Sequence, residues 1–361
     1  METRNSRLFS LLEGKVDAVA IINGGDSQID HNFKYFTRAR SGVFEGSTAL
    51  IGPKNTAVVT SVLEAPALKG LGVRVSVPKT RKQLEKTLVT LFSKHKTIGL
   101  NFPSVSYESF RALKKAYRGK IVDVSEEIAK CRSVKDGDEI KKIAESCRIA
   151  SMAAEKIPGM LTEGMTESQL AARLSMALYE EGSEGPSFSP IVSFGRTSAI
   201  PHYFPGKVKL KKGDFVLTDF GGKYDMYCSD ITRTCIFGKA TERQRELYET
   251  VKSSQEAALK LIKAGAREVD VDAAARKVID GSSFKGRFIH GLGHGLGLQV
   301  HDGRPVLSPR GTEVLKEGMV VTVEPGAYVD GYGGVRIEDD VVVTRNGYRQ
   351  LTTAKRELIE V

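Results

Sequence analysis

The sequence predicts two domains, an α/β domain followed by an α+β domain, and three observations support this. The chain has 361 residues, enough for two domains that each bury a core. Short apolar strand patterns alternate with amphipathic helix patterns over residues 1–125. Residues 126–361 instead combine long helix patterns with apolar, β-branched runs that contain acidic residues. We therefore place the boundary between residues 125 and 126.

The elements of the N-terminal domain follow from the spacing of its apolar residues. This segment has no cluster of catalytic residue types, and we expect its histidines at the surface. The charged segment 120–137 is interpreted as the boundary region. The patterns predict helices over 4–13, 79–95 and 106–119, and strands over 16–22, 48–52, 56–60, 73–77 and 97–102.

The second domain shows longer helix patterns. A charged helix over 138–156 should end at Pro158-Gly159. Thr166 to Gln169 forms a capping-box pattern that predicts the start of the next helix. Further helices are expected over 242–265 and 270–279, and strands over 319–328 and 335–344.

Composition restricts the class of protein. Hydrophobic residues make up 40% and charged residues 27% of the chain, which is typical of a globular protein. No apolar stretch approaches ~18 residues, and the first residues lack a signal-peptide pattern, so we expect a cytoplasmic protein without a membrane partner. The four cysteines show no CxxC spacing. The net charge of +10 favours anionic partners, but basic residues occur along the whole length, so we expect no nucleic acid partner.

Half of the six histidines fall within one glycine-rich stretch. Residues 290–301 read HGLGHGLGLQVH and contain His290, His294 and His301. Glycines between them remove side-chain bulk and allow a ligand to approach the backbone closely. A phosphate-binding loop is disfavoured because no GxGxxG opens a helix here and no Lys-Ser follows.

Four acidic residues in apolar runs surround this stretch. A carboxylate in such a run is costly unless it is paired or bound to a metal. Carboxylates together with a histidine form a ligand set for divalent cations. Asp219 and Asp230 are eleven residues apart, so a hairpin centred on Tyr224-Asp225 would make them cross-strand neighbours. The four residues are Asp219, Asp230, Glu324 and Glu338.

These motifs resemble the pita-bread metallopeptidases, a family that includes Xaa-Pro dipeptidases (prolidases), Xaa-Pro aminopeptidases and methionine aminopeptidases. The resemblance is close over about the last 225 residues and looser over the first 130. It implies an α/β N-terminal domain and an α+β pita-bread (creatinase/aminopeptidase-like) catalytic domain. The matching motifs are IPHY with His202, the 290–301 run, VEPG, VRIED, and five ligands in order: Asp219, Asp230, His294, Glu324 and Glu338.

The resemblance also implies roles for these residues. Asp219 would chelate one divalent cation, His294 and Glu324 the other, and Asp230 and Glu338 would bridge the two. Mn, Co, Fe or Zn would suit these ligands. The remaining roles would be proton transfer for Glu324, oxyanion stabilisation for His301, substrate contact for His202, His290 and Tyr328, and ligand orientation for Arg336.

Several alternatives remain open at this stage. The resemblance implies proline-containing dipeptides or short peptides as substrates and a homodimer as the assembly. A prolidase would need an arginine for the free proline carboxylate, and both Arg304 and Arg310 qualify; His301-Asp302 also replaces the His-Glu that is common in these enzymes. We expect an Xaa-Pro dipeptidase first and an Xaa-Pro aminopeptidase second. A methionine aminopeptidase or a metal-free binding module fits less well.

Overall fold

The computed structural model describes residues 3–361, which form two compact units. The first unit is Met1–Arg132 and the second is Ser133–Val361. Helix α5 (Ser125–Ser133) ends the first unit. The division therefore lies seven residues beyond the position expected from the sequence.

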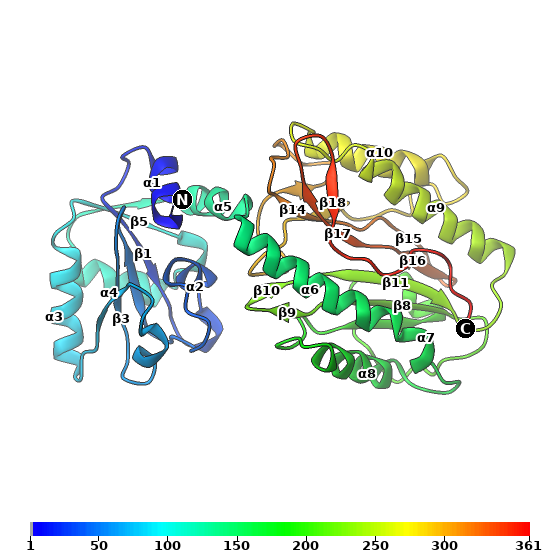
Figure 1. Ribbon diagram of the computed structural model, residues 1–361, viewed down its shortest axis with the longest axis horizontal. Coiled ribbons are helices and arrows are strands. Elements are labelled where there is room, and N and C mark those ends of the chain that lie inside the picture. The colour runs from blue at the N-terminus through cyan, green and yellow to red at the C-terminus, as the bar shows by residue number, and fades with distance from the viewer. Residues whose placement is uncertain (1–2) are drawn as a thin grey trace. The chain divides into compact units, whose positions relative to one another are not determined.

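The first unit is built on a mixed six-stranded sheet with the order β4-β3-β2-β1-β5-β6 (Figure 1). The pairs β1–β2 and β2–β3 are antiparallel, whereas β3–β4, β1–β5 and β5–β6 are parallel. Strand β6 was not expected from the sequence, because its four residues alternate weakly and begin with a lysine. The strands are β1 (Ala18–Ile22), β2 (Thr48–Ile51), β3 (Thr56–Val59), β4 (Arg74–Ser76), β5 (Thr97–Leu100) and β6 (Lys120–Asp123).

Two amphipathic helices cover one face of this sheet. Helix α3 (Arg81–Phe92) and helix α4 (Tyr107–Ala116) are capped by Thr80 and Ser106, whose side chains accept the Gln83 and Ser109 N–H groups. Their apolar residues pack on alternate residues of β1 and on β5. The polar surfaces of both helices are left on the outside. Helices α1 (Arg4–Leu12) and α2 (His31–Thr37) complete the first unit.

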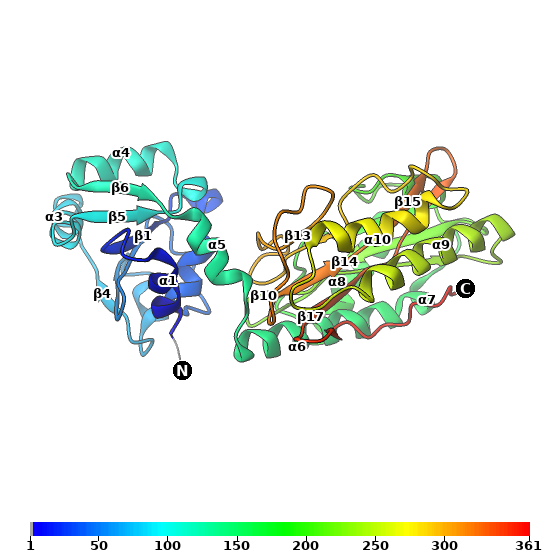
Figure 2. The ribbon, with the colours of Figure 1, turned by 90° about the horizontal axis from the view of Figure 1, so that it is seen from above.

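The second unit contains two helix–sheet layers with separate cores (Figures 1 and 2). In one layer, α6 (Gly137–Glu155) and α8 (Glu167–Glu180) pack on the sheet of β7 (Ile191–Phe194), β8 (Phe215–Phe220) and β11 (Ile231–Ile236). Helix α6 ends before Pro158, and the short helix α7 (Ile157–Met160) follows.

In the other layer, α9 (Glu242–Leu259) and α10 (Glu268–Asp280) pack on β14 (Val320–Val323) and β17 (Asp339–Val343). Strand β18 (Tyr348–Gln350) completes that sheet, and the pairs β12 (Gly293–His294) with β13 (Val306–Leu307) and β15 (Gly326–Val329) with β16 (Gly333–Arg336) lie beside it. Every helix within residues 3–361 is too short or too polar to span a bilayer.

The hairpin that carries Asp219 and Asp230 differs from its expected register. Asp219 pairs with Thr232, and the turn lies at Asp225-Met226 between β9 (Lys223–Tyr224) and β10 (Tyr227–Cys228). Both turn residues have positive φ, 45° and 72°, as a tight two-residue hairpin requires. The prediction that the two acids are direct cross-strand neighbours is therefore wrong. Asp230 is instead two residues before Thr232, diagonal to Asp219.

Candidate metal centre

A cavity of about 500 Å³ in the second unit brings together all five residues that the sequence predicted as metal ligands. They come from both layers, because β8 and the start of β11 belong to one layer and the segments around β12, β14 and β17 to the other. His202, His290, His301 and Arg336 line the same cavity. Residues that are up to 136 positions apart in the chain therefore line one cavity.

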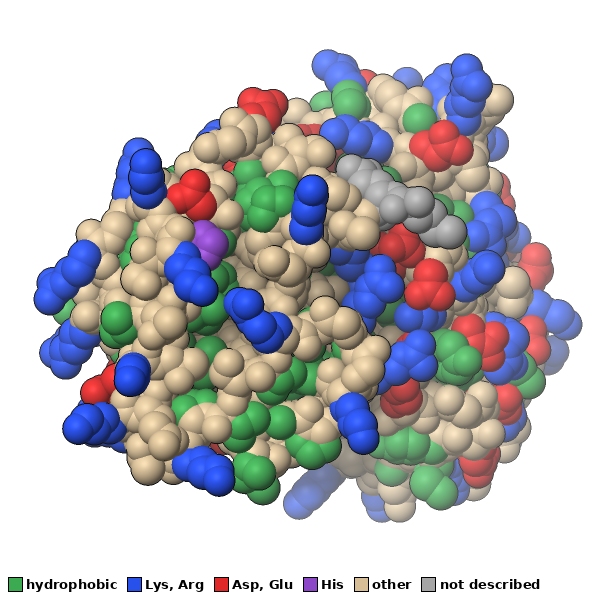
Figure 3. Space-filling view, turned by 60° about the vertical axis from the view of Figure 1, so that its left-hand side comes forward, with side chains coloured by type: hydrophobic (Ala, Val, Ile, Leu, Met, Phe, Trp, Pro, Cys, Tyr) green, Lys and Arg blue, Asp and Glu red, His purple; other side chains and the backbone are tan. Residues whose placement is uncertain are grey.

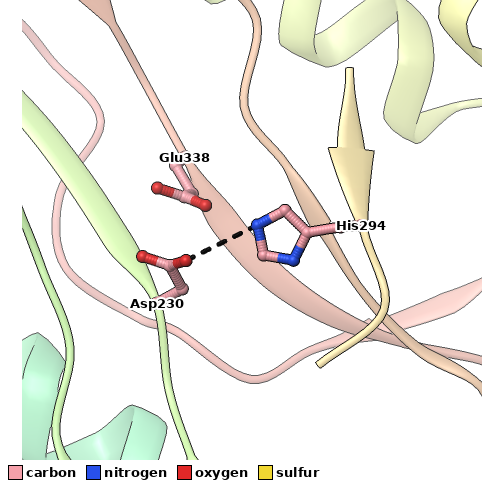
Figure 4. A group of neighbouring side chains, drawn as sticks. All are labelled: Asp230, His294 and Glu338. Carbon is pink, nitrogen blue, oxygen red and sulfur yellow. Dashed lines mark ion pairs between the residues drawn. The ribbon is translucent and has the colours of Figure 1, made fainter. Parts of the chain in front are cut away.

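Three of these side chains form a compact group. One ligand atom each from Asp230, His294 and Glu338 lies within 4.8 Å of the other two. Figure 4 shows the three side chains pointing toward one another from different segments. His294 Nε2 lies 3.7 Å from Asp230 Oδ2 and 3.4 Å from Glu324 Oε1. This spacing leaves room for a cation between the groups.

The carboxylates in the cavity have oxygens that lack protein partners. Asp219 Oδ1, Asp230 Oδ1 and Glu338 Oε1 are buried and make no hydrogen bond to the described residues. Buried polar atoms are normally satisfied, and an unsatisfied charged oxygen costs more than a neutral one. Oxygen-rich ligation with one imidazole suits divalent cations such as Mn²⁺ or Zn²⁺. The residues present therefore fit a metal centre.

Thr232 orients two of the site residues. Its Oγ1 donates to Glu338 Oε2 at 2.6 Å and accepts from Arg336 Nε at 3.1 Å. The hydroxyl thus directs the second, unsatisfied oxygen of Glu338 into the cavity. The expected orientation of Glu338 by Arg336 is therefore indirect and runs through the hydroxyl of Thr232.

Arg336 itself begins a buried polar chain. Its Nη2 lies 2.5 Å from Asp219 Oδ2, and its Nη1 donates to the Tyr328 hydroxyl at 2.8 Å. The Tyr328 hydroxyl lies 2.9 Å from His290 Nε2, and His290 Nδ1 lies 2.8 Å from the Gly291 carbonyl. Since a carbonyl can only accept, Nδ1 carries the proton and Nε2 accepts from Tyr328. The predicted ligand Asp219 is therefore paired with Arg336, which Tyr328 links in turn to His290.

Burial shapes the protonation of the site. It lowers the pKa of His290 to about 4 and that of His294 to about 3, so both imidazoles are neutral at neutral pH. Burial raises the pKa of Glu324 to about 8, and the neighbouring Arg336 partly offsets that rise. The pKa values of Asp230 and Glu338 are raised by burial and then by the surrounding carboxylates.

Two glycines allow the strand that bears His294 to lie close to its neighbours. A side chain on Gly293 would collide with the backbone of Thr322, and one on Gly295 with the backbone of Arg304. The close approach lets Thr322 Oγ1 accept the His294 N–H at 3.0 Å. This explains in physical terms why the histidine run is rich in glycine.

The two remaining histidines border the open side of the cavity. His301 is exposed and stacks on His294, with ring centroids 3.8 Å apart. His202 is also exposed and follows a 3-10 turn (Gly195–Ala199). Both positions allow contact with a molecule bound in the cavity.

The two arginines considered for carboxylate recognition lie elsewhere. Arg304 Nη1 forms an ion pair with Glu313 Oε1 at 2.8 Å, and Arg310 is exposed. Neither side chain lines the cavity, although Ser308 and Val306 between them do. The structure therefore does not bring these two residues to the other site residues.

Two buried glutamates that the sequence analysis did not single out hold the loops beside the cavity. Glu167, the first residue of α8, accepts the N–H groups of Phe194 at 3.1 Å and Gly206 at 3.0 Å. Glu268, the first residue of α10, accepts the N–H groups of Val306 at 2.9 Å and Glu313 at 3.0 Å. Glu167 follows the predicted capping residue Thr166, but no sequence pattern indicates the loop groups that it binds.

A third unexpected acid, Asp340, accepts a hydrogen bond from the backbone of Asp230. Asp340 Oδ2 accepts the Asp230 N–H at 2.9 Å and the Cys147 thiol at 3.2 Å. Burial raises the pKa of Asp340 to about 8. The sequence offered the signal of two further acids after Glu338, in IEDD, but both were left unassigned.

Comparison with known families identifies both parts of the chain. Residues 141–345 match the sequence model of Metallopeptidase family M24, and residues 4–134 match that of the Creatinase/Prolidase N-terminal domain. These matches confirm the resemblance that the motifs indicated. They also confirm the fold class, an α/β domain followed by a pita-bread catalytic domain.

Individual relatives agree with this assignment over almost the whole chain. An Xaa-Pro dipeptidase of Pyrococcus horikoshii is 33% identical over 99% of this chain and 100% of its own length. The structure of an Xaa-Pro dipeptidase from Bacillus anthracis superposes with a TM-score of 0.92, at 32% identity and 99% coverage of both chains. That of an X-Pro aminopeptidase from Thermotoga maritima has a TM-score of 0.88, at 35% identity, covering 96% of this chain and 98% of its own.

Proposed function

Since this chain belongs to Metallopeptidase family M24, we propose that it is a metal-dependent peptidase that hydrolyses the bond before proline, with Xaa-Pro dipeptides as preferred substrates. The observation that carries this proposal is the group of buried, unsatisfied carboxylate oxygens around His294, in a cavity lined by three further histidines. The dipeptidase relatives that match nearly the full length support the choice of substrate.

We propose that the five cavity residues hold two divalent cations. Asp219 would bind one and His294 with Glu324 the other, while Asp230 and Glu338 would be shared. Two such cations polarise a carbonyl and generate a nucleophile from water at neutral pH. Asp219 Oδ1, Asp230 Oδ1 and Glu338 Oε1 are available to bind the cations. Arg336 holds the other carboxylate oxygen of Asp219, and Thr232 holds that of Glu338. The Asp230 N–H donates to Asp340.

The chain's own residues supply the other requirements of the reaction. Glu324 lines the cavity beside His294, where its carboxylate could take up and return a proton. It would carry a proton to the leaving prolyl nitrogen, which has no hydrogen of its own before cleavage. His301, exposed beside His294, would stabilise the negative charge that develops on the carbonyl oxygen.

The polar chain from Asp219 to His290 fixes the substrate side of the cavity. His290 presents an imidazole whose tautomer is set by Gly291, and Tyr328 is held between it and Arg336. Because these groups are already paired, they need no rearrangement when a substrate enters. His202 would contact the substrate from the opposite loop.

Hydrolysis assays on matched peptides test this function. The metal-free protein is reconstituted separately with Mn²⁺, Co²⁺, Fe²⁺ and Zn²⁺ and assayed with Ala-Pro, Ala-Pro-Ala and Ala-Ala. We expect Ala-Pro to be cleaved fastest, Ala-Pro-Ala more slowly and Ala-Ala least. Faster cleavage of Ala-Pro-Ala would support the second candidate, an Xaa-Pro aminopeptidase, which the Thermotoga maritima neighbour favours. Cleavage without metal, or no cleavage of either Ala-Pro or Ala-Pro-Ala, would contradict both candidate functions.

The identity of the metal, the assembly and the compartment belong to the same proposal. We propose manganese or cobalt as the working metal and a homodimer as the assembly. The four cysteines are buried and are not joined by disulfides within residues 3–361, which agrees with a reducing compartment such as the cytoplasm. Metal analysis of the purified protein and sedimentation equilibrium would test the first two points.

A further inference from the structure

The positive charge of this chain is concentrated in one part of the N-terminal unit. Residues 74–120 contain twelve Lys and Arg but only two Asp and Glu, a net charge of +10. The other residues carry 42 of each sign, so this segment accounts for the entire net charge of the protein. Basic residues occur along the whole chain, but their excess over acidic residues lies in this segment.

The fold places these side chains on exposed parts of neighbouring elements of the first unit. The segment comprises β4, α3, β5, α4 and the first residue of β6, and its two helices cover the same face of the sheet. All twelve basic residues are exposed. In the left-hand part of Figure 3, Lys and Arg side chains clearly outnumber acidic ones. We call this surface the basic face: Arg74, Lys79, Arg81, Lys82, Lys86, Lys94, Lys96, Arg111, Lys114, Lys115, Arg118 and Lys120.

Most of this charge is not neutralised within the protein. Within residues 3–361, the one ion pair made by the basic face joins Arg81 to Glu85 at 3.4 Å, on the exposed surface of α3. Holding so many like charges on one surface costs free energy through their mutual repulsion. Outside the basic face, a second copy of the chain carries no net charge, so it offers no net negative charge to match the basic face. The matching partner is therefore an external polyanion.

Two further features fit a nucleic acid strand. A cavity of about 340 Å³ opens beside α3 and is lined by Arg74, Lys86 and Lys94 of the basic face, with hydroxyl groups of Ser76 and Thr90. At the start of α4, the Tyr107 ring is 77% exposed, and the Arg111 guanidinium lies 5.8 Å from its centroid. Exposed aromatic rings beside basic groups are the surfaces on which unpaired bases stack.

We propose that the basic face binds single-stranded nucleic acid, with its lysines and arginines on the phosphates and Tyr107 against a base. This reverses the expectation, based on composition alone, that nucleic acid is not a partner. The activity is separate from the proposed peptidase reaction, because the basic face contains none of the residues of the candidate metal centre. It would attach the enzyme to RNA or DNA without a change in its cleavage of peptides.

Fluorescence anisotropy with labelled 20-nucleotide poly(U) and poly(dT) tests the proposal on the full-length protein. We expect binding at 50 mM KCl that weakens steeply as salt rises, because binding releases condensed counterions. The triple variant Lys82→Gln, Lys86→Gln, Lys115→Gln should bind ~10-fold more weakly or worse, and its log–log salt slope should be smaller by about 2. Its matched control replaces Lys207, Lys211 and Lys212, three exposed lysines of the second unit, by Gln.

The variant Tyr107→Ala distinguishes the binding of nucleic acid, which has bases, from the binding of polyanions without bases. We expect it to weaken poly(U) binding ~10-fold through lost stacking, and to leave binding of inorganic polyphosphate unchanged. The proposal is overturned by absence of binding at 50 mM KCl or by equal losses in the two triple variants. It is also overturned by association with phosphatidylserine vesicles in place of nucleic acid. Ala-Pro cleavage by all three variants should equal that of the wild type, and circular dichroism checks their folding.

Discussion

Arg336 and Asp219 form a buried ion pair, Nη2 to Oδ2 at 2.5 Å, inside the cavity of the candidate metal centre. The pair uses one oxygen of the aspartate and leaves Oδ1 without a protein partner. A cation ligand can therefore be fixed in orientation by an arginine and still be available for binding.

Removing this arginine should be costly. In Arg336→Met, Asp219 Oδ2 loses its partner in a buried setting, and the Tyr328 hydroxyl loses a donor. We expect the free energy of unfolding of the metal-free protein to fall by about 3–5 kcal/mol in urea titrations. Arg304→Met is the matched control: its ion pair with Glu313 is partly exposed and should be worth about 0–1 kcal/mol. Equal losses would contradict the importance of the buried pair.

The proposed shared ligands should control metal content. Asp230→Asn and Glu338→Ala each remove a negative charge from the cavity, so we expect each to lose at least one metal ion per chain and nearly all activity. Inductively coupled plasma mass spectrometry of dialysed protein measures the content. Asp225→Asn, in the turn of the same hairpin, should retain its metals. Two ions still bound in both ligand variants would remove these residues from the assignment.

His301 should act on turnover and not on metal binding. His301→Ala removes the exposed ring that stacks on His294, while the carboxylates stay in place. We expect unchanged metal content and a kcat for Ala-Pro that is roughly 10²–10³-fold lower, as for loss of an oxyanion-stabilising group. His95→Ala, in the N-terminal unit, is the control. Turnover at the wild-type level would exclude His301 from the reaction.

Recognition of the proline carboxylate should depend on Arg310 more than on Arg304. Arg304 is already paired with Glu313, whereas Arg310 is exposed and lies two residues after Ser308 of the cavity wall. We expect Arg310→Met to reduce kcat/KM for Ala-Pro about 30-fold, which corresponds to about 2 kcal/mol for a lost charged hydrogen bond. Ala-Pro-Ala should be much less affected. If Arg304→Met shows the larger selective loss of Ala-Pro cleavage, Arg304 and not Arg310 recognises the carboxylate.

The stability of the metal-free protein should depend on pH through Glu324. Its pKa is raised to about 8 in the folded protein, so the folded state holds a proton that the unfolded chain releases near its ordinary value of 4.5. The contribution of Glu324 to stability is then greatest below that ordinary value and is lost as pH rises through about 8. We expect a lower Tm at pH 9 than at pH 6 in EDTA, and a weaker dependence in Glu324→Gln. Added Mn²⁺ should raise Tm most at pH 9, because binding releases the proton.

Much of the architecture was predictable, because it follows from local patterns. The capping-box pattern at Thr166 and the spacing of apolar residues indicated most helices at nearly their observed positions. Strand β6 and helix α5 were missed, because short, charged elements carry little periodicity and depend on their neighbours for stability. The predicted turn of the hairpin was wrong by one residue, because the residue types of Asp225 and Met226 do not indicate their positive φ values.

The candidate site was predictable in composition but not in its connections. The order and residue types of the five ligands indicated a metal centre, and the structure brings all five to one cavity. The sequence did not show that Arg336 pairs with Asp219, or that Thr232 links Arg336 to Glu338. Such links join residues about 100 positions apart, and they depend on how the two layers meet. The family relationship supplies the order of the ligands, and only the packing supplies their partners.

Glu167 and Glu268 have a consequence for how substrate preference can evolve or be redesigned. Apart from the hydroxyl groups of Thr197 and Tyr203, the loop groups that hydrogen-bond to the two glutamates are backbone N–H groups, at Phe194, Gly206, Val306 and Glu313. Any residue except proline offers that donor. The side chains of the two loops can therefore be exchanged widely while the loops stay anchored. A library aimed at new peptide substrates should randomise positions such as 306 and 308 and leave the two glutamates untouched.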